Sequence, residues 1–142
     1  MSTSVTARKL NTRQKLLLAD LAASLFLALF GAVYEAFSHG VYSYGMIYAF
    51  AFPLVLGVLP FLLIGMLRAP YPGRMTRSVY HAGIATLAVG SIVSGVLEIY
   101  GTTSPLTIVY WILGGALVLA GAAAYGFSRL RTANTADANT PS

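Results

Sequence analysis

Four long apolar runs alternate with short polar or turn-rich connections along the sequence. The runs cover residues 16–37, 46–67, 79–100 and 107–127. Each is close to the length of about 20 residues with which a helix crosses the hydrocarbon core of a bilayer. The pattern therefore predicts an all-α integral membrane protein, a four-helix bundle with short connections between its spans. The lipid bilayer is its first expected partner.

The composition supports this prediction. Of the 142 residues, 57% are hydrophobic and only 9% are charged, whereas about a quarter of the residues of an ordinary soluble domain are charged. A globule of this size could not bury so much apolar surface, so the excess must face lipid. The absence of cysteine excludes disulfides and thiolate metal sites.

Positive charge is confined to three places along the chain. All nine lysines and arginines lie before the first run, between the second and third, or after the fourth: Arg8, Lys9, Arg13, Lys15, Arg68, Arg74, Arg77, Arg129 and Arg131. Basic connections stay on the cytoplasmic side of a membrane. We therefore expect a multi-pass protein of the cell membrane with both termini in the cytoplasm. Because this distribution also explains the net charge of +5, no nucleic-acid partner is expected.

These patterns divide the chain into three parts. Residues 1–15 are expected to form a basic cytoplasmic N-terminal segment, and residues 16–128 the four-span membrane domain. Residues 129–142 end in the small, polar stretch TANTADANTPS. Such a composition buries too little apolar surface to order a segment, so a disordered cytoplasmic tail is predicted.

Two stretches near the ends of the first and third runs resemble each other. GAVYEAFSHG carries Glu35 and SGVLEIYGTT carries Glu98, and superposing the two glutamates places His39 over Thr102. The similarity is consistent with two parallel helix-pair repeats. Transporter folds commonly contain such repeats, although duplication also produces inert bundles.

Helical spacing indicates where the two glutamates point. The residues three, four, seven and eleven positions before Glu35 are small: Ala32, Gly31, Ala28 and Ser24. Those three, four and seven positions before Glu98 are small too: Gly95, Ser94 and Ser91. Small residues line helix contacts in membranes because they let backbones approach closely. Both glutamates are therefore expected to face the bundle interior near its outer mouth.

Two interpretations of these carboxylates remain open. Each glutamate lies within about one helical turn of the outer boundary, so both could simply reach the water at the headgroups. Alternatively, Glu35 and Glu98 form an outward-facing cation site, in which their mutual repulsion favours a shared proton or a bound cation. In that case Tyr34, Tyr100 and Tyr110 would add cation–π attraction for an amine.

The remaining ionisable residues give weaker signals. His39 follows Glu35 by four residues and could share a proton or a weakly held metal ion with it. Two ligands make a poor metal signature, so neither a metal site nor a cofactor is predicted. His81 lies at the opposite face of the bilayer, which excludes haem ligation by the two histidines together. Asp20 is expected to pair with the basic residues that precede the first run.

Two further patterns concern helix geometry. Pro53, Gly57 and Pro60 fall within two turns of the second span and predict a break or hinge, because proline removes a backbone hydrogen bond. The fourth span carries alanines every four residues, which predict a packing seam within the chain or toward a partner: Ala116, Ala120 and Ala124.

Two classes of function fit the sequence. It contains no nucleophile–base pair, phosphate-binding loop or metal-ligand cluster, so an enzyme is not expected. The favoured function is an accessory or interaction subunit of a larger membrane assembly. The alternative is a small oligomeric transporter or channel component with the cation site at Glu35 and Glu98. Either function implies a second copy or a larger membrane protein as a partner. An accessory subunit needs the assembly to which it binds, and a transporter needs further helices because four alone rarely enclose a conducting path.

Overall fold

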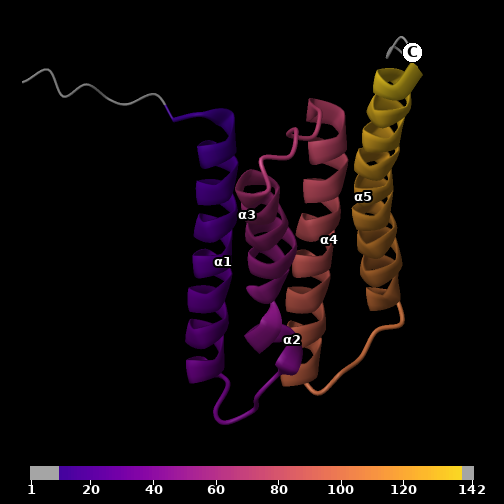
Figure 1. Cartoon of the computed structure of the whole chain (residues 1–142). Coiled ribbons are helices and arrows are strands. Elements are labelled where there is room, and N and C mark those ends of the chain that lie inside the picture. The colour runs from indigo at the N-terminus through magenta and orange to yellow at the C-terminus, as the bar shows by residue number, and fades with distance from the viewer. Residues whose placement is uncertain (1–9, 139–142) are drawn as a thin grey trace, which may run out of the picture.

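The computed structural model describes residues 10–138. All regular secondary structure in this range is helical (Figure 1). It contains, in chain order, α1 (Thr12–Phe37), α2 (Tyr44–Tyr48), the π-helical segment η1 (Phe52–Val58), α3 (Leu59–Met66), α4 (Arg74–Ile99) and α5 (Thr107–Ala138). Residues 1–9, which include Arg8 and Lys9, and residues 139–142 lie outside the described range.

Four helical stretches are long and apolar enough to cross a membrane: α1, the combined span Tyr44–Met66, α4 and α5. The combined span contains α2, η1 and α3 and is called the second span below. The prediction of four membrane-spanning helices is confirmed on length and composition, and the fold is compatible with a multi-pass membrane protein. The first three helical stretches begin two to five residues before their apolar runs, whereas α5 begins with its run at Thr107.

The four spans stand side by side in an open row (Figure 1). The second span packs between α1 and α4, and α5 packs along α4. The chain enters α1, connects α3 to α4 and leaves α5 at one end of the row, which we call the basic end. The α1–α2 and α4–α5 connections lie at the other end, which we call the glutamate end because Glu35 and Glu98 lie beside it.

Close approach between neighbouring helices depends on glycine. A Cβ atom on Gly31 of α1 would lie 2.9 Å from the carbonyl oxygen of Met46, and one on Gly95 of α4 would lie 2.7 Å from its amide nitrogen. Both glycines belong to the predicted stripes of small residues. The stripes therefore make room for the second span, whose backbone passes between α1 and α4.

The second span departs from regular α-helix where proline and glycine were expected to break it. In η1 the amide of Leu59 bonds the carbonyl of Leu54, five residues earlier, which is the hydrogen-bond spacing of a π-helix. Pro53 and Gly57 lie inside η1, and Pro60 follows it by two residues. A hinge function of these residues stays a prediction.

The C-terminal end differs from the prediction. Helix α5 continues to Ala138, so residues 129–138 are helical, where a disordered tail was expected. The small polar residues of this part are compatible with helix, because threonine hydroxyls bond backbone carbonyls of the preceding turn: Thr132 to Ser128, and Thr135 to Arg131. All side chains from residue 126 to 138 are exposed, so this end of α5 is held by its own helical bonds.

The two helix pairs are less alike than a repeat would suggest. The second span is broken by η1, whereas α5 is a single continuous helix. The proposed internal repeat therefore stays a prediction that rests on the sequence similarity.

Candidate functional site

The two predicted glutamates converge on one buried serine at the glutamate end. The hydroxyl of Ser43 donates to Oε2 of Glu98 at 2.5 Å, and the Ser43 amide donates to Oε1 of Glu35 at 3.4 Å. Ser43 is fully buried, whereas Glu35 is half-buried and Glu98 is exposed. A single residue just before the second span therefore joins the last turns of α1 and α4.

Ser43 is positioned by its role at the start of α2. It is the N-cap residue, and its hydroxyl accepts from the Met46 amide, as N-cap serines commonly do. The hydroxyl thus accepts from its own helix and donates to Glu98. Ser43 is not among the residues predicted for this site, although a serine before an apolar run is a recognised signal for a helix start.

The other residues predicted for this site lie apart from the two carboxylates. Tyr34, His39 and Tyr100 line a surface cavity of about 430 Å³ between the ends of α1 and α4, whose lining includes neither glutamate. Tyr110 packs on Gly90, where an added Cβ atom would clash with the tyrosine Cβ. Tyr110 therefore belongs to the contact between α4 and α5.

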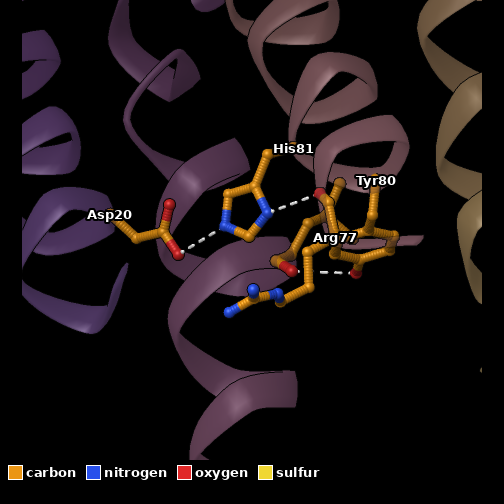
Figure 2. A network of polar contacts seen from close by, with 5 residues as sticks. Asp20, Arg77, Tyr80 and His81 are labelled. Carbon is orange, nitrogen blue, oxygen red and sulfur yellow. Dashed lines mark hydrogen bonds and ion pairs between the residues drawn. The ribbon is translucent and has the colours of Figure 1, made fainter. Parts of the chain in front are cut away.

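A second polar cluster lies nearer the basic end, inside the row (Figure 2). Asp20 of α1 is only 6% exposed, and its Oδ2 lies 3.1 Å from Nε2 of His81 on α4. The expectation that Asp20 pairs with the basic residues before the first run is therefore wrong. The helical phase of Asp20 places it toward the second span and α4, whereas those basic residues lie nearer the helix start.

The second span supplies the surroundings of this pair. A Cβ atom on Gly57 would lie 2.8 Å from Cγ of Asp20, so glycine is what lets the carboxylate rest against η1. The ring of Phe61 stacks on His81 with the ring centroids 5.1 Å apart. Three spans therefore enclose one carboxylate and one imidazole within the membrane-spanning part of the fold.

The hydrogen bonds of His81 determine how many protons the pair holds. Its Nδ1 lies 2.9 Å from the backbone carbonyl oxygen of Arg77, which can only accept, so Nδ1 carries a hydrogen. Its Nε2 forms a hydrogen bond with Oδ2 of Asp20. The hydrogen of this bond belongs either to Nε2, which then donates to the carboxylate, or to a protonated Asp20, which then donates to Nε2. In both arrangements the pair holds one shared proton and is neutral overall.

Signals for this cluster are present in the sequence. Asp20 and His81 each lie within one turn or so of the start of an apolar run, the first and the third. Because α1 and α4 begin at the same end of the row (Figure 1), the two residues lie at similar heights in it. Ionisable residues inside a span are a functional-site hypothesis by default, but the sequence does not indicate that these two residues pair.

No family model, curated protein or solved structure matches this chain. Within residues 10–138, no group of three or more histidine, cysteine, aspartate or glutamate side chains could hold a metal ion. The function is therefore argued from the two clusters and the helix surfaces.

Substitutions at Asp20 should separate hydrogen bonding from charge. Asp20→Asn keeps a hydrogen-bond donor for a neutral Nε2 of His81, so its unfolding free energy should be close to that of the parent. Asp20→Ala leaves the imidazole without that partner and should lose about 1–3 kcal/mol of unfolding free energy. Unfolding of the purified protein in mixed micelles, followed by circular dichroism, measures both. An alanine variant as stable as the parent would show that the pair contributes nothing to packing of the three spans.

Proposed function

We propose that the protein is an interaction subunit of a larger membrane assembly and that it docks through the outer face of α5. The contact of α5 with α4 uses one side of the helix, where Gly114 and Gly121 are buried. The residues of the predicted alanine seam are exposed: Ala116, Ala120 and Ala124. This seam is the observation that carries the proposal.

The spacing of the alanines explains why the seam suggests a protein partner. The exposed faces of α1 and α5 both carry large side chains, among them Leu25 on α1 and Leu119 on α5, which are 63% and 70% exposed. Such residues suit contact with lipid tails. Lipid does not require small residues, whereas a neighbouring helix can approach closely over alanine. A seam of alanines on an unpartnered helix face is therefore better explained by a second helix than by lipid.

The proposed orientation follows from the basic end. The described lysines and arginines lie before or in the first turns of α1 and α4, in the α3–α4 connection, or in the last turns of α5. The positive-inside rule assigns this end to the cytoplasm. Both termini are then cytoplasmic, and Glu35 and Glu98 face the outside.

Photo-crosslinking in native membranes tests the docking face. A photoreactive amino acid at Ala120 should give a discrete protein adduct, because a partner helix lies against the seam. The same amino acid at Ala23, an exposed alanine of α1, is the matched control and should give none. Adducts are detected on denaturing gels and identified by mass spectrometry.

The outcomes distinguish the alternatives. An adduct of twice the chain mass at Ala120 would show that the seam binds a second copy of this protein, and not a subunit of a larger assembly. Absence of any protein adduct from positions 116, 120 and 124 would contradict docking through α5.

A second candidate function, a small oligomeric transporter with an outward-facing cation site, is favoured by the convergence of Glu35 and Glu98 on Ser43. Two carboxylates from different spans share one buried hydroxyl-bearing residue. Each carboxylate keeps a second oxygen with which it could bind a cation. A partner or second copy would have to complete the pathway.

Flux into proteoliposomes tests this candidate. Wild-type protein should show cation- or proton-dependent flux, and Glu98→Gln should lower it by tenfold or more, about 1.4 kcal/mol, because the charge that attracts the cation is removed. Asp137→Asn, at the far end of α5, is the control and should leave the flux unchanged. A wild-type protein that moves no ion, or a Glu98→Gln variant equal to it, would rule the candidate out.

A further inference from the structure

A cavity of about 320 Å³ opens at the basic end between the beginnings of α1 and α4. Five of the six residues that line it are polar or basic: Thr12, Leu16, Arg74, Arg77, Ser78 and His81. The apolar run of α4 begins at residue 79, so the cavity lies where the hydrocarbon meets the headgroups. Its position and lining differ from those of the docking face on α5 and of the two glutamates.

The charge of the cavity is positive. None of the residues that line it is acidic. The carboxylate of Asp20, which does not line the cavity, is paired with His81. Burial raises the pKa of the Tyr71 phenol, although the neighbouring Arg77 guanidinium opposes this shift. Tyr71 is therefore neutral at neutral pH, and the guanidinium groups of Arg74 and Arg77 are left without a negative partner in the cavity.

Backbone donors also lack acceptors here. Helix α4 begins after Gly73, which has no side chain to cap it, whereas Asn11 and Gln14 cap α1 in a reciprocal pair. The uncapped amides of a first helical turn favour anions. Arg74, the first residue of this helix, is exposed and lines the cavity together with Arg77. An anion in the cavity would therefore supply acceptors to their guanidinium groups beside the uncapped turn.

We propose that this cavity binds the phosphate of an anionic phospholipid headgroup, held by Arg74, Arg77 and the uncapped start of α4. A lipid fits better than a free phosphate ion because the cavity lies at the membrane boundary and includes Leu16. From there an acyl chain can follow the apolar surfaces of α1 and α4. Basic pockets between membrane helices on the cytoplasmic side commonly bind such headgroups.

Lipid titration of the delipidated protein tests the proposal. The purified chain in mild detergent is titrated with phosphatidylglycerol or phosphatidylcholine, and the bound lipid is counted by native mass spectrometry. Phosphatidylglycerol should bind more tightly. Arg74→Gln should weaken it about fivefold and Arg74→Gln/Arg77→Gln about 25-fold, from the usual contribution of one basic residue near anionic lipid. Arg129→Gln, exposed on α5, is the matched control and should stay within about twofold of the parent.

Two further measurements keep the test decisive. Arg74 is exposed, so its substitution should preserve the fold, which circular dichroism checks. Inorganic phosphate at millimolar concentration should not displace phosphatidylglycerol, and displacement would assign the site to free phosphate and overturn the lipid proposal. Equal binding of the two lipids, or an equal loss in the Arg74→Gln and Arg129→Gln variants, would also overturn it, because general surface charge would then explain the binding.

Discussion

The structure depends on the need to satisfy backbone hydrogen bonds without water. Inside a bilayer an unpaired carbonyl or amide costs several kcal/mol, so a helix broken by proline is tolerated only where neighbours supply partners. An α-helix would bond the amide of residue 60 to the carbonyl of Leu56, but Pro60 has no amide hydrogen. The Tyr80 hydroxyl of α4 donates to this carbonyl at 2.8 Å, as Figure 2 shows for the labelled tyrosine.

The same requirement explains the place of the second span between two continuous helices. From α1, the Ser24 hydroxyl donates to the Phe50 carbonyl at 3.0 Å. From α4, the Ser91 hydroxyl donates to the Gly45 carbonyl at 2.6 Å. Both serines are buried. Helices α1 and α4 thus stabilise an irregular segment that lipid could not, and the position of this segment brings Ser43 to the glutamates and Gly57 to the Asp20–His81 pair.

The sequence predicted the features that depend on composition and periodicity. Four spans, the small-residue stripes and the break near Pro53 all follow from patterns within single helices. Such patterns did not predict the Asp20–His81 pair or the bridging role of Ser43, because each depends on which helices become neighbours. Apolar periodicity does not specify that order. The helical continuation past Ser128 was missed for a different reason, since a small, polar composition is compatible with both coil and the extension of an existing helix.

The central claim is that a side chain of α4 replaces the hydrogen bond that Pro60 removes from the second span. Isotope-edited infrared spectroscopy tests it most directly, with a ¹³C=¹⁸O label at the Leu56 carbonyl of the protein in lipid bilayers. The account predicts a lowered, hydrogen-bonded carbonyl frequency that rises when Tyr80 is replaced in Tyr80→Phe. A frequency unchanged by this substitution would contradict it.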